Sequence, residues 1–178
     1  MRREESDGSI RNKPLIEYFT QLKDSGFLKQ QTMQQYCSIS SDGVTKFLPD
    51  RYVEGECPVC GSDDARGDQC DDCGSTYESI ELINPRSKMD PNAKIEVRDT
   101  EHFFFQLDQF QDELESHSLT KQKIWKPNVR AMTKNWLNME LRPRAVTRDM
   151  EWGIKVPISD KDWDTKRIYV WFEAVQGY

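Results

Sequence analysis

Apolar residues near the start of the chain recur at the spacing of an amphipathic helix. They are Leu15, Phe19 and Leu22. This spacing predicts a helix over residues 14–24. A proline is tolerated in the first turn of a helix, and Gly26 supplies a stop.

The clearest predicted helix begins at Pro127. It cannot pass far beyond Leu141, because Pro143 forces the preceding residue out of helical geometry. A shorter helix is predicted around residues 109–116. The apolar stripe of the longer helix consists of Val129, Met132, Trp136 and Leu137.

Elsewhere the pattern predicts extended segments separated by polar turns. The predicted segments are short pieces within 27–53, broken at 40–43, then 80–83, 103–107 and a buried strand at 167–173, with a polar turn at 84–92. The chain has no internal repeat. It ends soon after the last predicted strand, and we therefore expect it to be a fragment of a longer protein.

Composition narrows the class of protein. A chain of 178 residues with 11% aromatic residues, gathered in clusters, is typical of a folded domain. It has neither the run of about 20 apolar residues of a membrane span nor a secretory signal. We therefore expect a cytoplasmic protein with no membrane partner. The net charge of −6 argues against a broad electrostatic grip on nucleic acid.

Four of the five cysteines form two Cys-x-x-Cys pairs, nine residues apart and each followed by glycine: Cys57, Cys60, Cys70 and Cys73. Two such pairs supply four thiolates, which complete a tetrahedron with bonds of about 2.3 Å and leave no position for water. The pattern predicts one structural Zn²⁺. Few apolar residues lie nearby, so removal of the metal should unfold about residues 55–76.

The cysteine pairs have an alternative interpretation, and a few other residues resemble functional motifs. A redox dithiol or an iron–sulfur cluster is the alternative for the cysteines, although a redox site favours a single Cys-x-x-Cys at a strand–helix junction. Arg66-Gly67-Asp68 spells a cell-adhesion tripeptide inside the metal loop, where a structural role is expected. His102 and His117 are expected to be structural or surface residues, and Cys37 a buried or half-buried thiol.

Longer strings around the cysteines resemble the methionyl-tRNA synthetase family, and the resemblance covers nearly the whole chain from about residue 13. In order, the strings are Phe47-Leu-Pro-Asp-Arg-Tyr-Val-Glu-Gly, the cysteine segment 57–74, Glu81-Leu-Ile-Asn-Pro-Arg-Ser, Thr100-Glu-His-Phe-Phe-Phe, Leu141-Arg-Pro-Arg-Ala-Val-Thr-Arg-Asp, Trp152-Gly-Ile-Lys-Val-Pro and Tyr169-Val-Trp-Phe-Glu-Ala.

The resemblance implies an α/β fold, namely part of a Rossmann-type class I synthetase catalytic domain with an inserted, zinc-ribbon-like α+β connective peptide. Residues 1–35 then end the first half of the catalytic domain. Residues 36–145 form the connective peptide, which helps to place the tRNA acceptor end. Residues 146–178 begin the second half of the catalytic domain, with 168–172 as its first strand.

The resemblance also implies a role in substrate binding. Arg148 matches an arginine near the charged end of the substrate. Family residues that line the methionine pocket are matched by Trp171, Ala174, Val175 and Tyr178. An indole suits a thioether, because sulfur packs favourably against aromatic rings. Without the resemblance, Trp171 is interpreted as an aromatic residue in the core of a strand.

Two departures from the family pattern matter. Cys37 lacks the partners of a second zinc knuckle, so a single zinc is expected. The two ATP signatures, His-x-Gly-His and Lys-Met-Ser-Lys-Ser, are absent, and the nearest match, Ser87-Lys-Met-Asp, stands in the wrong place. The chain carries no catalytic residue of its own, and alone it is expected to be inactive.

The resemblance thus predicts a fragment of a methionine–tRNA ligase that uses methionine, ATP with Mg²⁺ and tRNA(Met), and not DNA. One alternative is a stand-alone zinc-ribbon module that binds RNA or protein without catalysis. The other is a purely structural interaction domain. The first alternative predicts tRNA affinity of the chain alone, and the second predicts contact with neither methionine nor tRNA.

Overall fold

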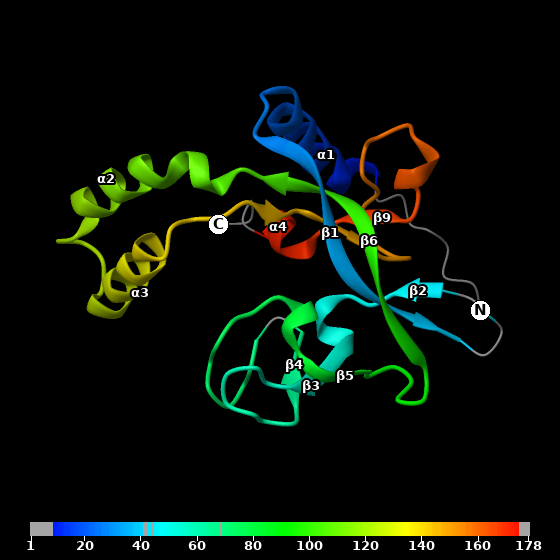
Figure 1. Cartoon of the computed structure of the whole chain (residues 1–178). Helices are drawn as coiled ribbons and strands as arrows, with labels where there is room; N and C mark the ends of the chain where they lie inside the picture. The colour runs from blue at the N-terminus through cyan, green and yellow to red at the C-terminus, as the bar shows by residue number, and fades with distance from the viewer. Residues whose placement is uncertain (1–8, 41–42, 44, 68, 175–178) are drawn as a thin grey trace. The chain divides into compact units, whose positions relative to one another are not determined.

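A computed structural model describes residues 9–40, 43, 45–67 and 69–174 of the chain. It has the mixed α/β composition that the sequence predicts (Figure 1). The chain divides into two compact units, each described by itself. The helical unit comprises Met1–Gln30, Phe103–Val146 and Tyr169–Tyr178, and the knuckle unit comprises Gln31–His102 and Thr147–Ile168. The division into residues 1–35, 36–145 and 146–178 stays a prediction.

Helix α1 of the helical unit, Ser9–Asp24, confirms the first predicted helix but starts earlier. Pro14 therefore lies inside the helix and not in its first turn, so the prediction of its position was wrong. Gly26 has a φ of +80°, and its N–H donates to Lys23 O at 3.0 Å. This left-handed residue after the last turn ends the helix as predicted.

Aromatic rings form the core of the helical unit. Phe19 is fully buried and meets Phe103 edge to face, with ring centroids 5.4 Å apart. Phe110 packs against Phe27 and Phe105 at 5.2 Å and 5.6 Å. Such pairs stabilise by about 0.5–1.5 kcal/mol beyond the burial of their area.

The helical hairpin of this unit consists of α2, Gln111–Lys121, after the 3-10 turn η3, Leu107–Phe110, and α3, Pro127–Asn138. The bounds of α3 confirm the predicted start and stop. The side chain of Gln111 joins the two helices, because its Nε2 donates to Leu137 O at 2.9 Å and its Oε1 accepts from Leu141 N at 3.0 Å. Of the predicted apolar stripe only Leu137 is buried, while Trp136 is half exposed.

The end of the described chain is the short helix α4, Val170–Ala174, so the prediction of a strand over 167–173 was wrong beyond Ile168. The N–H of Phe172 donates to Tyr169 O at 3.0 Å, so this backbone bonds locally and not to a neighbouring strand. The Phe172 ring stacks on Tyr18 and meets Phe19 edge to face. This packing favours the helix, because it buries one side of the run.

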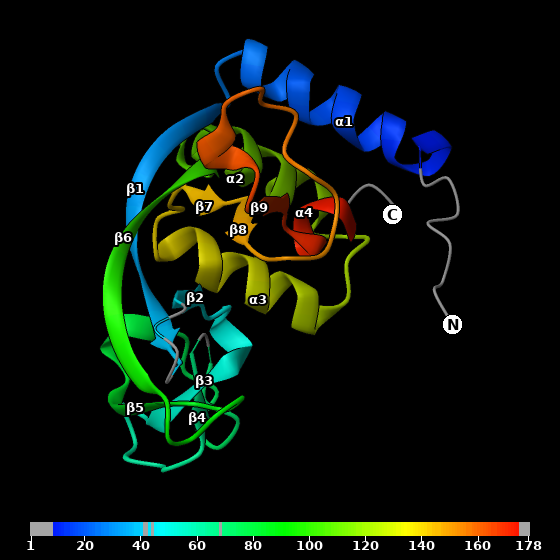
Figure 2. The ribbon, with the colours of Figure 1, turned by 90° about the vertical axis from the view of Figure 1, so that its right-hand side faces the viewer.

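In the knuckle unit, β1, Leu28–Ile39, lies between β2, Thr45–Phe47, and β6, Lys94–Phe105 (Figure 2). The register of β1 and β2 pairs Cys37 with Phe47. The sequence predicted short pieces here, whereas β1 and β6 are both long strands. The first residues of β1 and the last residues of β6 belong to the helical unit, where Phe104 of β6 pairs with Ala145 of β7, Arg144–Ala145.

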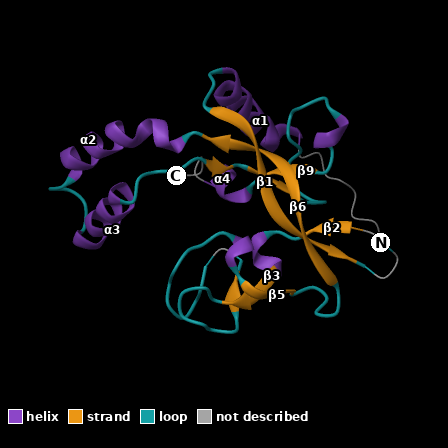
Figure 3. Cartoon of the chain, viewed as in Figure 1, coloured by secondary structure: helices purple, strands orange, loops and turns teal. Residues whose placement is uncertain are grey.

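A second sheet of the knuckle unit has the order β4-β3-β5 and carries the cysteine loops. Figure 3 shows its strands β3 and β5 among these loops. Its strands are β3, Val53–Glu56, β4, Ala65–Arg66, and β5, Ile83–Ser87, flanked by the 3-10 turns η1, Asp50–Tyr52, and η2, Ser79–Glu81. The predicted strand at 80–83 is wrong, because Ile80 lies in η2 and the strand begins at Ile83. The predicted polar turn at 84–92 begins only after Ser87. A capping box between Glu78 and Glu81 favours the turn over a strand.

The remaining strands of the knuckle unit are β8, Thr147–Asp149, and β9, Lys166–Ile168, which pair antiparallel with Arg148 opposite Arg167. The 3-10 turn η4, Lys161–Trp163, precedes β9. Among the described residues, the structure contains no helix that is both long and apolar enough to cross a membrane.

Candidate metal centre and substrate-binding residues

The two cysteine pairs form two hairpin loops of the same backbone geometry. In the first loop the N–H of Gly61 donates to Cys57 O at 3.0 Å, and in the second the N–H of Gly74 donates to Cys70 O at 2.9 Å. Gly61 and Gly74 have φ values of +74° and +72°, a region that L-residues with side chains rarely adopt. The glycines thus close the tight turns that the sequence predicts.

The four sulfur atoms of the loops converge. All lie within 4.8 Å of one another. Cys57 Sγ is 3.8 Å from Cys73 Sγ, and Cys60 Sγ is 3.7 Å from Cys70 Sγ. A tetrahedron with metal–sulfur bonds of about 2.3 Å has edges of about 3.8 Å, so these separations fit one four-coordinate ion. The cluster can therefore hold a metal ion.

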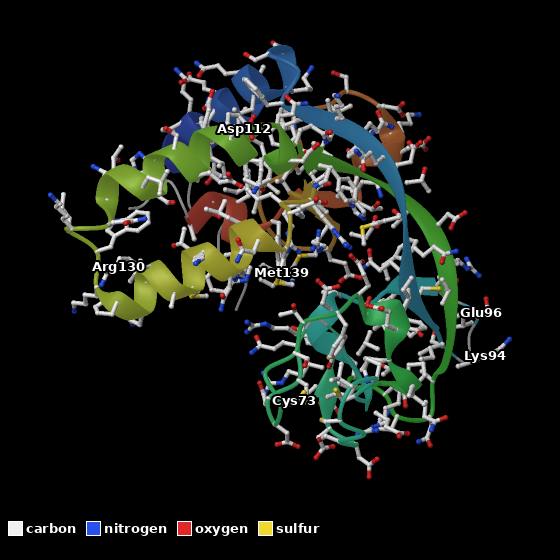
Figure 4. All side chains as sticks on the ribbon, turned by 60° about the vertical axis from the view of Figure 1, so that its left-hand side comes forward. Cys73, Lys94, Glu96, Asp112, Arg130 and Met139 are labelled. Carbon is white, nitrogen blue, oxygen red and sulfur yellow. The ribbon has the colours of Figure 1, made fainter. Side chains whose placement is uncertain are left out.

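The environment of the cluster is asymmetric. Cys57 and Cys70 are buried, whereas Cys60 and Cys73 are exposed on the loops, where Figure 4 labels Cys73. The Val59 N–H donates to Cys57 Sγ at 3.4 Å. Hydrogen bonds with the side chain and the backbone of Ser75 lower the pKa of Cys73 to about 6. Donors of this kind stabilise the negative charge that four thiolates give to a divalent ion.

The cluster stands on a small apolar core. Besides Cys57 and Cys70, this core contains Tyr36, Leu48, Val53, Ala65 and Leu82. Of these residues only Ala65 and the two cysteines come from the loops themselves. The loops therefore have little apolar burial of their own, as the sequence predicts.

The cysteine and histidines outside the cluster behave as expected. Cys37 is fully buried, its Sγ donates to Glu96 O at 3.5 Å, and burial raises the pKa of its thiol. His102 is fully buried, and His117 is exposed. Arg66 pairs with Asp71 at 3.2 Å, while Asp68 of the tripeptide lies outside the described residues.

Arg148 lies at the centre of β8 in the knuckle unit. Its Nη1 donates to Thr147 O at 2.9 Å, and its Nη2 lies 3.5 Å from Asp50 Oδ2. Both side chains are largely shielded from water, with 12% and 17% exposure. The guanidinium is therefore held in place at one edge by an acidic partner. Asp50 stands in the string that begins at Phe47, but no local pattern in the sequence predicts its pairing with Arg148.

The other predicted pocket residues lie at the end of the chain. Trp171 and Ala174 lie on α4 in the helical unit, and Trp171 is 58% exposed. Its indole thus projects away from the core that Phe172 enters, which corrects its interpretation as an aromatic residue in a strand core. Val175 and Tyr178 lie outside the described residues. Arg148 and Trp171 belong to different units, and the structure places each within its own unit only.

One connection in the knuckle unit was not visible in the sequence. The Gly67 N–H, in the loop between the cysteine pairs, donates to Asp50 O and to Val53 O, both at 3.1 Å. A Cβ at Gly67 would lie 2.4 Å from Asp50 O. The metal loop therefore rests directly on the turn that carries the partner of Arg148.

A mixed α/β fold with a four-cysteine knuckle defines an α/β protein that carries a module able to hold a metal ion. The family model described as tRNA synthetases class I (M) matches residues 6–178. The chain belongs to this family. It is 48% identical over 163 residues to the methionine–tRNA ligase of Thermoplasma volcanium, which covers 91% of this chain and 28% of that protein. It is 46% identical over 167 residues to the corresponding ligase of Picrophilus torridus, covering 93% and 23%.

Solved structures agree on the fold. Methionyl-tRNA synthetase of Mycobacterium tuberculosis in complex with methionyl-adenylate matches with a TM-score of 0.57 and 15% identity, over 99% of this chain and 29% of that one. The apo form of that enzyme matches with a TM-score of 0.55 and 17% identity, over 100% and 29%. The chain thus spans between a fifth and a third of the length of these proteins, and it has the fold of the corresponding part.

Proposed function

We propose that this chain is part of a cytoplasmic methionine–tRNA ligase. The whole enzyme forms methionyl-adenylate from methionine and ATP, with Mg²⁺ and with release of pyrophosphate, and then transfers the methionyl group to tRNA(Met) with release of AMP. The observation that carries this proposal is the 48% identity to a methionine–tRNA ligase over 91% of the chain. The proposal also divides the chain into the end of the first catalytic half, residues 1–35, the connective peptide, 36–145, and the start of the second half, 146–178.

The metal of the knuckle is proposed to be Zn²⁺, bound by Cys57, Cys60, Cys70 and Cys73. The sulfur separations of 3.8 Å and 3.7 Å support this choice, because they match tetrahedral zinc–thiolate geometry. Four protein ligands leave no place for a substrate, so the ion acts as a structural element. It organises the loops of the connective peptide, which is proposed to help place the acceptor end of the tRNA.

The pocket for methionine is proposed to include Arg148, Trp171, Ala174, Val175 and Tyr178. Arg148 is a suitable partner for a carboxylate or phosphate, since its guanidinium is largely shielded from water and already oriented by Asp50. Trp171 offers an exposed aromatic face to the methionine thioether.

The experiment is methionine-dependent exchange of pyrophosphate into ATP by the full-length protein that contains this chain. Arg148→Ala should raise the KM for methionine about 10- to 100-fold, because a hydrogen bond to a charged group contributes about 1.5–3 kcal/mol. Arg148→Lys should recover part of the loss. The isolated chain should be inactive, since it lacks both ATP signatures. If the full-length protein is folded but has no exchange activity, the proposal is wrong.

A stand-alone zinc-ribbon module is the second candidate, and the relatives do not favour it. It predicts that the isolated chain binds tRNA with the affinity of the whole protein. Titration of labelled tRNA with both forms separates the two functions.

A further inference from the structure

Five polar side chains are buried together in the knuckle unit, away from the cysteine loops. Each is at most 7% exposed, although four of the five belong to residue types that usually reach water or form functional sites. This polar cluster consists of Thr100 and His102 on β6, Thr147 and Asp149 on β8, and Lys166 on β9.

The carboxylate of Asp149 accepts hydrogen bonds from two other members of the polar cluster. Its Oδ1 accepts from Lys166 Nζ at 2.9 Å, and its Oδ2 accepts from Thr100 Oγ1 at 2.7 Å. Lys166 Nζ also donates to Thr100 Oγ1 at 2.7 Å, so these three side chains close a ring. The Lys166 ammonium lies 5.7 Å from the centre of the Trp163 ring, which adds a cation–π contact.

His102 also belongs to the cluster, because both of its ring nitrogens lie close to polar partners. Nε2 lies 3.2 Å from Asp149 Oδ2, and Nδ1 lies 3.0 Å from Thr147 Oγ1. An ionised carboxylate only accepts, so the proton of a neutral ring is assigned to Nε2, and Nδ1 then accepts from the Thr147 hydroxyl. Burial lowers the pKa of His102, in spite of the nearby Asp149 carboxylate.

A buried ion pair of this kind is a poor device for stability alone. Hydrophobic residues of similar volume often stabilise a fold as well or better, because two charges must be taken out of water. What a hydrogen-bonded polar cluster provides is a single geometry, since each partner restricts the others. The geometry that it fixes here is that of β8, which supplies two of the five members.

Thr147 and Asp149 flank Arg148 on β8, and their side chains alternate with it. Both are buried, whereas Arg148 is partly exposed. Successive side chains of a strand point to opposite faces, so anchoring Thr147 and Asp149 aims Arg148 at the other face. On that face its guanidinium meets Asp50.

We infer that the polar cluster is a positioning device, in which Thr100, His102, Asp149 and Lys166 hold β8 so that Arg148 meets the charged end of the substrate. This inference rests on the proposed function, because it assumes that Arg148 binds substrate. The four residues touch no substrate themselves and act through Arg148.

The test is a double-mutant cycle in the full-length enzyme, read by pyrophosphate exchange. Asp149→Asn keeps the shape of the side chain and removes its charge. It should raise the KM for methionine about 10- to 100-fold with little change in kcat, since a displacement of about 1 Å in a binding group can cost 100-fold. In an Arg148→Ala background the same substitution should have no further effect on this KM.

A second variant covers the case in which Asp149→Asn does not fold. Thr100→Val removes only the hydroxyl from the ring and should raise the KM for methionine, whereas Thr100→Ser should restore it. Asp112→Asn, on α2, is the matched control and should leave the KM unchanged (Figure 4).

The outcomes separate the two proposals. If Arg148→Ala leaves the KM for methionine unchanged, Arg148 does not bind substrate and the proposed pocket is wrong. If Arg148→Ala raises the KM but Asp149→Asn and Thr100→Val do not, or if their effects add to that of Arg148→Ala, the polar cluster is merely structural and the inference is overturned.

Discussion

Removal of the metal is expected to unfold residues 55–76 locally while the helical unit stays folded. The perturbation is a chelator at neutral pH, or the variant Cys70→Ser, which deletes one of the buried ligands. The reason is the composition of the loops. Among the described residues of these loops, the buried apolar side chains are those of Cys57, Ala65 and Cys70.

The magnitude follows from comparing two contributions. Full burial of a large aliphatic side chain stabilises by about 1.5–3 kcal/mol, and these three side chains are smaller. A structural zinc ion in a zinc-finger peptide contributes about 10–16 kcal/mol at neutral pH. A zinc ion held by the four cysteines is therefore expected to be the largest single term that holds the loops. Hydrogen bonds such as that from Cys57 N to Ser62 O, at 2.8 Å, are too few to replace it.

The assay is hydrogen exchange followed by mass spectrometry, together with the zinc content of the purified chain. One ion per chain is expected. After chelation, peptides from 55–76 should lose protection, whereas peptides from α1 and α3 should keep it. Cys37→Ser is the matched control, because Cys37 is buried but lies outside the cluster, and it should retain the ion. Unchanged protection of 55–76 without metal would refute the reasoning.

Two further predictions concern stability. Hydrogen bonds from His102, Lys166 and Thr100 outweigh the effect of burial and lower the pKa of Asp149 to about 2, from 3.8. This lowering contributes about 2 kcal/mol above pH 3.8, which is lost as the pH falls towards 2. The pKa of His102 is also lowered, so the unfolded state binds its proton more readily and stability should already fall below pH 6.5. Denaturant titrations between pH 8 and pH 2 check this order, and a stability that rises below pH 6.5 would contradict it. On α4, Phe172→Ala should cost about 2–3 kcal/mol, because the ring packs on Phe19, whereas Trp171→Ala, with 58% exposure, should change the Tm little. Equal losses in thermal melts of both variants would place the indole in the core.

The elements that the sequence predicted well have strong local signals. Pro127 and Pro143 bracket α3, and a glycine after each cysteine pair sets the turns of the knuckle. The long strand β1 has no such signal, because its segment Lys29-Gln-Gln-Thr-Met-Gln-Gln is mostly polar. Its conformation depends on pairing with β2, which follows after a short turn, and with β6, which lies far away along the chain.

At the end of the described chain, the sequence predicted a strand where the structure has a helix. The run Ile168–Phe172 is apolar throughout, and periodicity alone cannot distinguish a short strand from a short buried helix. The packing of Phe172 against Tyr18 and Phe19 decides for a helix, and neither contact can be read from local sequence.

The candidate site also has one part that the sequence could predict and one that it could not. The cysteine cluster was predictable, because its ligands stand at a fixed local spacing and zinc requires that spacing. The polar cluster was not predictable from residue types, since an aspartate, a lysine and a histidine normally indicate a solvated surface. Only the pairing of β8 with β9, in the register that sets Asp149 opposite Lys166, brings these charges together inside the unit.

The metal loop and Arg148 are connected within the knuckle unit, and this connection predicts that the zinc contributes to methionine binding. Gly67 donates to Asp50 O, and the carboxylate of Asp50 faces Arg148. Gly67→Ala would force a Cβ to within 2.4 Å of Asp50 O, so η1 must shift although all four cysteines remain. In the full-length enzyme this variant should keep its zinc but raise the KM for methionine about tenfold, and chelation should have the same effect.

Gly43→Ala is the control, since its Cβ would meet nothing within 4 Å, and its φ of +81° should cost only about 1 kcal/mol of stability. A zinc-loaded Gly67→Ala enzyme with an unchanged KM would show that the knuckle and Arg148 act independently.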